Sequence, residues 1–145
     1  MGKYNFREDL KESQESVNRV VEFLKGIGCT EIQTNDDGRY DISYLTREGK
    51  QRTAEVKHDL MWDKTGNVAI EYTSRGKASG ISSSKADCWF YVLNQIYHCN
   101  TGDLRVYLIQ HWDRYRRVKG GDDNTSQLVL LKIDDFLDVF KEVRG

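Results

Sequence analysis

The chain has 145 residues and a formal net charge of −1, with 31% charged and 38% hydrophobic residues. This length suits one domain with its own core, and the composition excludes an intrinsically disordered chain. No apolar run approaches the ~20 residues of a membrane-spanning helix, and the polar start lacks the apolar stretch of a secretory signal. We therefore expect a single domain over residues 1–145, without membrane contact, in a cytoplasm-like compartment.

The three cysteines are Cys29, Cys88 and Cys99. An odd number without paired spacing argues against a disulfide framework, and the histidines show no zinc-like spacing. The sequence therefore predicts reduced thiols that are at least partly buried.

The first half of the chain predicts one helix and then a series of strands. Apolar residues recur at helical spacing from Tyr4 to Ile27, and Gly26 and Gly28 end the helix. A short strand over residues 29–34 is predicted next. Period-two alternation then predicts three strands, over residues 39–46, 52–59 and 67–74.

The second half predicts helices on either side of a buried strand. After a Gly- and Ser-rich loop, a capping box of Ser84 and Asp87 favours a helix over residues 85–97. The remaining segments are an apolar strand over 104–110, a charged flexible segment over 111–126, a strand over 127–133 and a helix over 134–143. This order predicts an α/β fold with a mixed sheet flanked by helices.

The three alternating strands each carry an apolar even face and a more polar odd face. A hairpin centred on the Glu48–Gly49 turn places Asp41 directly across from Glu55. A hairpin centred on Asp63 would place Glu55 directly across from Glu71. The simplest registers therefore align Asp41, Glu55 and Glu71 in one row on one face.

Like charges directly opposite one another destabilise a sheet, so such a row indicates a bound cation. Mg²⁺ takes oxygen ligands of this kind and keeps waters for a substrate phosphate. Lys57 follows Glu55 by two residues and points to the same face. It could stabilise a pentacoordinate phosphate or hold an attacking water.

The stretch RYDISYLTREGKQRTAEVKHD (residues 39–59) resembles the core of the PD-(D/E)XK nuclease superfamily, which includes restriction enzymes and Holliday-junction resolvases. There an aspartate on one strand precedes Glu-x-Lys on the next. The matching residues are Asp41 and Glu55-Val56-Lys57, and Tyr40 replaces the proline that names the motif. The segment that begins at Val68 resembles small phage-type endonucleases.

The resemblance implies a restriction-endonuclease-like αβββαβ core and Mg²⁺-dependent hydrolysis of DNA phosphodiester bonds, with Mn²⁺ as a possible substitute. Asp41, Glu55 and the backbone carbonyl of Val56 would hold the metal, and Lys57 would orient the water. The register adds Glu71 as a metal ligand and catalytic residue. The substrate would be duplex or branched DNA, the enzyme a possible homodimer, and the setting a bacterial or phage-infected cell.

Other interpretations of these residues remain open. Asp41, Glu55 and Lys57 could form a cross-strand ion pair on an exposed sheet face, and Glu71 could pair with Lys57. Glu12 and Glu15 on the first helix could reach the metal, although surface charge is the simpler interpretation. The alternative function is a catalytically inactive nucleic-acid-binding or protein-interaction module on the same fold.

A nucleic-acid-binding protein of this net charge must gather its basic residues on one face. Two segments supply such basic residues: the loop that follows the third strand and the charged segment over 111–126. In the charged segment, arginines alternate with Trp112 and Tyr115, and together they could bind the DNA backbone and unpaired bases. The predicted nucleic-acid-binding residues are Arg75, Lys77, Ser79, Lys85, Arg114, Arg116 and Arg117.

Overall fold

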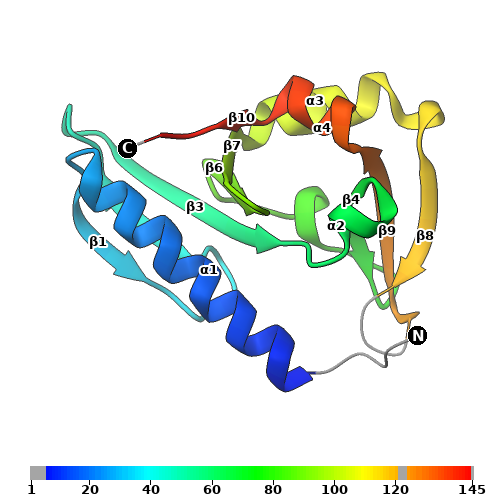
Figure 1. The fold of residues 1–145 in the computed structure, drawn as a ribbon, viewed down its shortest axis with the longest axis horizontal. Coiled ribbons are helices and arrows are strands. Elements are labelled where there is room, and N and C mark those ends of the chain that lie inside the picture. The colour runs from blue at the N-terminus through cyan, green and yellow to red at the C-terminus, as the bar shows by residue number, and fades with distance from the viewer. Residues whose placement is uncertain (1–5, 121–123, 145) are drawn as a thin grey trace.

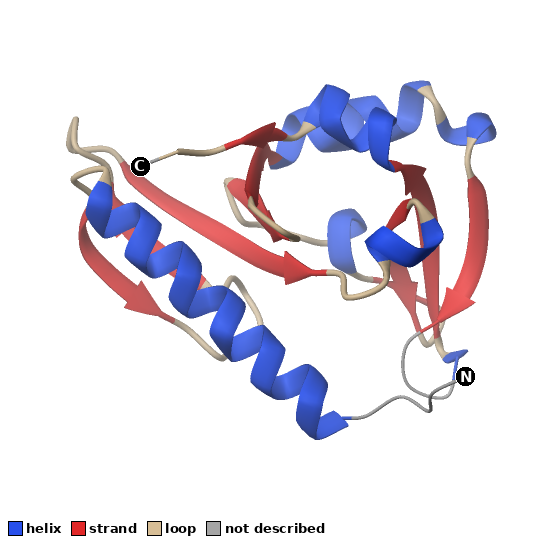
Figure 2. Cartoon of the chain, in the orientation of Figure 1, coloured by secondary structure: helices blue, strands red, loops and turns tan. Residues whose placement is uncertain are grey.

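A computed structural model describes residues 6–120 and 124–144 of the chain. These residues form two β-sheets and four α-helices, with the sheets side by side and helices α3 and α4 along one edge (Figures 1 and 2). The larger sheet has six strands in the order β1-β2-β3-β6-β7-β10, and the smaller has four in the order β5-β4-β9-β8. The predicted α/β class with a mixed sheet is confirmed at this level.

The six-stranded sheet begins with an antiparallel meander and continues with a parallel pair. β1, β2 and β3 are antiparallel neighbours, β6 runs parallel to β3, and β7 returns antiparallel to β6. Their bounds are Thr30–Thr34 for β1, Ile42–Leu45 for β2, Gln51–His58 for β3, Cys88–Val92 for β6, Ile96–Asn100 for β7 and Lys141–Glu142 for β10.

The tight turn between β2 and β3 sets the register of this meander. Gly49 has a φ of 87° and its amide donates to the carbonyl of Thr46 at 2.8 Å. Only glycine adopts this left-handed backbone without steric cost. Ile42 therefore pairs with Ala54, as the turn arithmetic predicts.

Helix α1 (Phe6–Gly26) covers one face of the six-stranded sheet and runs alongside β3 (Figure 1). Its Val20 and Leu24 are fully buried against Ile42, Ala54 and other apolar residues of the sheet. The predicted amphipathic helix is confirmed within the described residues, and Tyr4, its predicted first residue, lies outside them.

The four-stranded sheet and the remaining helices enclose a second core. This core contains Val68 and Ile70 of β4, Val129 and Leu131 of β9, and Phe136 of α4. The bounds are Asn67–Ser74 for β4, Lys77–Ala78 for β5, Arg116–Gly120 for β8, Ser126–Lys132 for β9, Trp62–Thr65 for α2, Thr101–Gln110 for α3 and Ile133–Val139 for α4. Two short 3₁₀ helices, η1 (Gly80–Ser82) and η2 (Trp112–Arg114), complete the fold.

Two of the predicted elements are wrong. Residues 85–97 form no helix, because they contain β6 and the start of β7, joined by a turn at Asn94–Gln95. Residues 104–110 form part of helix α3 and not a strand. Both segments are short apolar runs, and such a run does not distinguish a buried strand from a buried helix. All five residues of β6 are buried. Its aromatic and β-branched side chains favour a strand over a helix.

The C-terminal third is more regular than predicted. The charged segment over 111–126 contains η2 and strand β8, and the final helix α4 ends at Val139 before the short strand β10. Strand β9 confirms the strand predicted over 127–133. Among the described residues, no helix combines the length and apolar character that crossing a membrane requires. All three cysteines are free and buried, as predicted.

Candidate active site

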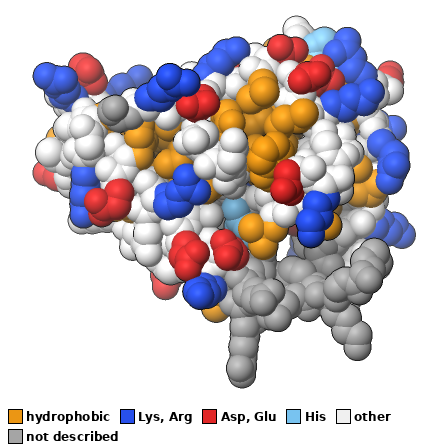
Figure 3. All heavy atoms as spheres, viewed as in Figure 1, with side chains coloured by type: hydrophobic (Ala, Val, Ile, Leu, Met, Phe, Trp, Pro, Cys, Tyr) orange, Lys and Arg blue, Asp and Glu red, His pale blue; other side chains and the backbone are white. Residues whose placement is uncertain are grey.

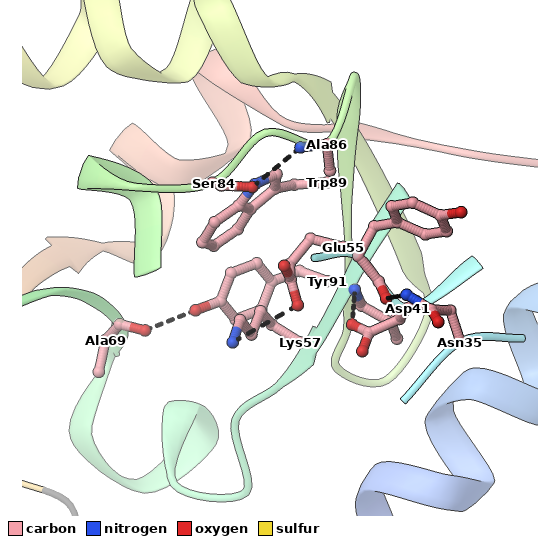
Figure 4. A network of polar contacts seen from close by, with 11 residues as sticks. Asn35, Asp41, Glu55, Lys57, Ala69, Ser84, Ala86, Trp89 and Tyr91 are labelled. Carbon is pink, nitrogen blue, oxygen red and sulfur yellow. Dashed lines mark hydrogen bonds and ion pairs between the residues drawn. The ribbon is translucent and has the colours of Figure 1, made fainter. Parts of the chain in front are cut away.

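Asp41 is held by its backbone between two strands, just before β2 begins. Its amide donates to the carbonyl of Ala54 on β3 at 2.9 Å, and its carbonyl accepts the amide of Asn35, just after β1, at 2.9 Å. Its side-chain Oδ2 accepts the backbone amide of Val56 at 2.7 Å (Figure 4). Two hydrogen bonds to β3 and one to Asn35 therefore fix the position of this residue beside β3.

Glu55 and Lys57 lie on β3 and point to the same side of the sheet (Figure 4). The Oε2 atom of Glu55 is 3.8 Å from the Nζ atom of Lys57, and their side chains are 18% and 37% exposed. Because Ile42 pairs with Ala54, the preceding Asp41 lies beside Glu55. The predicted neighbourhood of Asp41 and Glu55 on adjacent antiparallel segments is confirmed.

The two carboxyl groups are close enough to change the protonation of Glu55. Burial, a hydrogen bond with Asp41 and the negative charge of Asp41 raise the pKa of Glu55 to about 8, against the opposing effect of Lys57. Two carboxylates in this position repel one another when both are ionised. A cation bound between them would remove that repulsion.

A third oxygen is available on the same edge of β3. In a strand, the N–H and C=O groups of one residue point toward the same neighbouring strand. The amide of Val56 points to Asp41, so the carbonyl of Val56 lies on the Asp41 side as well. No set of three or more His, Cys, Asp or Glu side chains within the described residues is arranged to hold a metal. Two carboxylates and a carbonyl still fit Mg²⁺, which commonly uses one or two carboxylates and keeps several waters.

Two aromatic residues of β6 lie beside the motif and were not predicted as part of the site. Trp89 pairs with Glu55 and Tyr91 with Lys57 in the parallel register. The Nζ atom of Lys57 lies 5.7 Å from the centre of the Trp89 ring, whose Nε1 donates to the Ser84 hydroxyl at 3.1 Å. Trp89 is therefore a core residue that also forms a wall of the site (Figure 4). The sequence placed it on a helix and gave no signal of this role.

The predicted pairing of Glu55 with Glu71 is wrong. β4, which carries Glu71, pairs with β9 and β5 in the other sheet, and the second neighbour of β3 is β6. The connection after β3 turns the chain away, because Asp59 accepts the amides of Met61 at 2.8 Å and Ala69 at 3.0 Å. Glu71 is close enough to Tyr91 to contribute, after burial and Asp59, to the raised pKa of that tyrosine.

Glu12 and Glu15 of α1 line a different hollow. It has a volume of about 220 Å³ and is also lined by His58 and Asp59, and neither Asp41 nor Glu55 is part of this lining. Asp59 is thus a structural residue that anchors β4.

The predicted nucleic-acid-binding residues fall into two groups. Arg75, Lys77 and Lys85 are exposed around the β4–β5 turn and the segment before β6, whereas the Ser79 hydroxyl is buried without a hydrogen-bond partner. The second group comprises Arg114, Arg116 and Arg117, all exposed. Basic side chains gather along the right-hand edge of the face in Figure 3, over β8.

Trp112 and Tyr115, the aromatic residues next to these arginines in the sequence, are less accessible than expected. Arg117 lies over the Trp112 ring at 5.1 Å and donates to the Trp112 carbonyl at 3.0 Å. Tyr115 is 6% exposed, and its hydroxyl donates to that of Tyr107. The structure therefore removes Tyr115 as a base-stacking residue.

Comparison with protein-family models, curated proteins and solved structures finds no match.

Proposed function

We propose that this protein is a metal-dependent endodeoxyribonuclease of the PD-(D/E)XK type, with a restriction-endonuclease-like core. The observation that carries the proposal is the arrangement of Asp41, Glu55 and Lys57. Two adjacent carboxylates and a lysine ammonium 3.8 Å from one of them lie together where β2 begins beside β3, in the six-stranded sheet. A carboxylate pair that repels itself is a poor choice for stability alone.

Asp41, Glu55 and the carbonyl of Val56 would hold Mg²⁺ or Mn²⁺. When bound, the metal would polarise the scissile phosphate and lower the pKa of a water. The chain itself supplies the rigidity, since three hydrogen bonds hold Asp41 and the strand pairing with Trp89 holds Glu55. Fixed ligands avoid the reorganisation cost that mobile ones would add to the reaction.

Lys57 would orient the attacking water and stabilise the negative charge that develops on the phosphate. Its ammonium lies between the Glu55 carboxylate and the Trp89 ring, which limits the directions it can take. A side chain 37% exposed can still meet a substrate phosphate. We infer duplex or branched DNA as the substrate, bound by the basic residues around β5 and β8, and a homodimer where both strands are cut.

The test is cleavage of supercoiled, linear and junction DNA with Mg²⁺ or Mn²⁺, by the wild type and by Glu55→Gln. Glu55→Gln keeps the shape of the side chain and removes a metal-ligand charge, so cleavage should disappear while the fold is retained. Glu22→Gln on the exposed surface of α1 is the matched control and should cleave as the wild type does.

If the wild type does not cleave DNA, its DNA binding separates the two alternative functions. Binding of DNA without cleavage by the wild type, under all metal conditions, would instead support the inactive nucleic-acid-binding module. Absence of both binding and cleavage would support a protein-interaction module.

A further inference from the structure

A second concave site lies on the other face of the six-stranded sheet, under the last turns of α1. Its side chains occupy the even positions of the strands, whereas Glu55 and Lys57 occupy odd ones. The cavity has a volume of about 500 Å³, which lies within the range of small-ligand sites. It is separate from the proposed active site and does not depend on nuclease activity.

Polar side chains from three strands converge in this cavity. Arg52 of β3 donates from Nη2 to Asn100 Oδ1 at 2.9 Å, and His98 of β7 lines the cavity beside it. The Tyr44 hydroxyl of β2 lies 3.5 Å from the Cys88 thiol, and both contact the Arg52 guanidinium. Strands β2, β3 and β7, with β6 between the last two, therefore direct hydrogen-bonding groups into one cavity.

The groups that contact the Arg52 guanidinium in this cavity are neutral. Within the described part of the chain, no carboxylate forms an ion pair with its guanidinium, which is half-buried. Arg47 adds a second positive charge to the lining, and Glu48 is the one acidic side chain there. In partly apolar surroundings an uncompensated arginine attracts an anion more strongly than it would in water.

The rest of the cavity is apolar and aromatic. The Phe90 ring lies 5.0 Å from the His98 ring and 6.3 Å from the Phe23 ring of α1. Leu24 and Ile27 of α1 complete this wall. A free inorganic anion would leave this surface uncovered, whereas a ligand with an apolar body would bury it.

We propose that this cavity binds a small amphipathic oxyanion, with a carboxylate or phosphate head on Arg52 and an aromatic or short aliphatic body against Phe23 and Phe90. The guanidinium fork suits both planar carboxylate and phosphate oxygens. Asn100 and the Tyr44 hydroxyl lie where they assist the arginine in holding the head.

The test is an NMR titration of the full chain with phenyl phosphate and, separately, with phenylacetate. Inorganic phosphate is the head-only control and phenol the body-only control. At least one amphipathic anion should shift the amides around Tyr44, Arg52 and Asn100, and should bind about tenfold or more tightly than either control. The tighter of the two ligands identifies the head group.

Two variants test the assignment of the site. Arg52→Gln removes the charge while keeping a polar side chain with an amide donor, and should weaken binding about tenfold or more. Ile27→Asp at the 37% exposed rim should also weaken it, by placing a negative charge in the wall. Arg39→Gln, whose arginine pairs with Asp37 on the surface, is the matched control and should bind as the wild type does.

Three results would overturn the proposal. The first is no binding of either amphipathic anion at millimolar concentration. The second is binding that is unchanged in both Arg52→Gln and Ile27→Asp, or that shifts the amides around Glu55 instead. The third is inorganic phosphate binding as tightly as phenyl phosphate, because the apolar wall would then contribute nothing.

Discussion

The Oδ2 atom of Asp41 accepts the backbone amide of Val56, the residue between Glu55 and Lys57, at 2.7 Å. One hydrogen bond thus joins the first residue of the motif to the strand that carries the other two. Because Val56 has a fixed backbone in β3, this bond holds the Asp41 carboxylate against the strand that carries Glu55. This bond can be tested separately from the chemistry.

Asp41→Asn keeps an oxygen that can accept the Val56 amide and removes the charge, whereas Asp41→Ala removes both. Both variants should lose cleavage. Asp41→Ala should also lower the free energy of unfolding by about 1–3 kcal/mol, because it leaves a partly buried amide unpaired, and Asp41→Asn should lower it less. Denaturant unfolding of the three proteins without divalent ions measures the difference. Equal destabilisation by both substitutions would contradict the structural role of this bond.

The raised pKa of Glu55 predicts how stability changes with pH. Its ordinary pKa is 4.5 and its value in the folded protein is about 8, so between these values the folded state retains a proton that the unfolded state has released. The metal-free protein should therefore lose stability as pH rises from about 4.5 to about 8. Below this window the penalty is absent, and above it the penalty is complete.

Glu55→Gln cannot titrate, so the difference between wild type and variant isolates this group. The free energy of unfolding of the wild type should fall relative to Glu55→Gln by roughly 1 kcal/mol or more across the window. Thermal or denaturant unfolding in the presence of EDTA at several pH values provides the measurement. A pH-independent difference would show that Asp41 and burial do not perturb Glu55.

Lys57→Ala should reduce turnover far more than DNA binding. The ammonium acts on charge that develops only in the transition state, so kcat should fall on the order of 10²-fold while KM changes little. The control is Lys50→Ala, because Glu48-Gly49-Lys50 is another Glu-x-Lys of the chain and lies in the exposed turn before β3. A variant with unchanged kcat and a raised KM would make Lys57 a DNA-binding residue only.

Glu71→Gln distinguishes the observed topology from the predicted one. β4 lies in the four-stranded sheet, so this substitution should leave metal affinity and cleavage nearly unchanged. Calorimetric titration with Mg²⁺ or Mn²⁺ compares it with Glu55→Gln, which should bind the metal much more weakly. A loss of affinity equal to that of Glu55→Gln would restore Glu71 as a ligand.

Lys77→Ala and Arg116→Ala test whether the basic residues around β5 and β8 bind DNA. Each should weaken binding across unrelated sequences and reduce the slope of log affinity against log salt by about one. Binding is measured in Ca²⁺, which prevents cleavage, over a range of salt concentrations. Lys11→Ala on exposed α1 is the control, and an effect as large as that of the other two would refute a localised DNA-binding surface.

The sequence predicts the arrangement of Asp41, Glu55 and Lys57 well, because the relevant signals are local. Alternation of apolar and polar residues assigns Asp41, Glu55 and Lys57 to one face, and the Gly49 turn fixes the register between β2 and β3. Both signals come from residues that are close together in the sequence, within the β2–β3 hairpin.

The sequence predicts the surroundings poorly because they depend on partners far along the chain. β6 is buried on both faces, so it lacks the alternation that identifies a strand. The position of β4 depends on β9, more than 50 residues later, and local pattern gave no reason to prefer that partner over β3. Glu71 was misplaced for this reason.

The parallel pairing of β3 with β6 also orders the assembly of the site during synthesis. β3 ends at His58, whereas its parallel neighbour β6 begins only at Cys88. Strand β4, which lies between them in the sequence, pairs with β9 at residues 126–132. The strand that carries Glu55 and Lys57 therefore leaves the ribosome long before the segments that enclose it. Such long-range contacts form slowly, so Glu55 and Lys57 should be among the last parts of the nascent chain to reach their final surroundings.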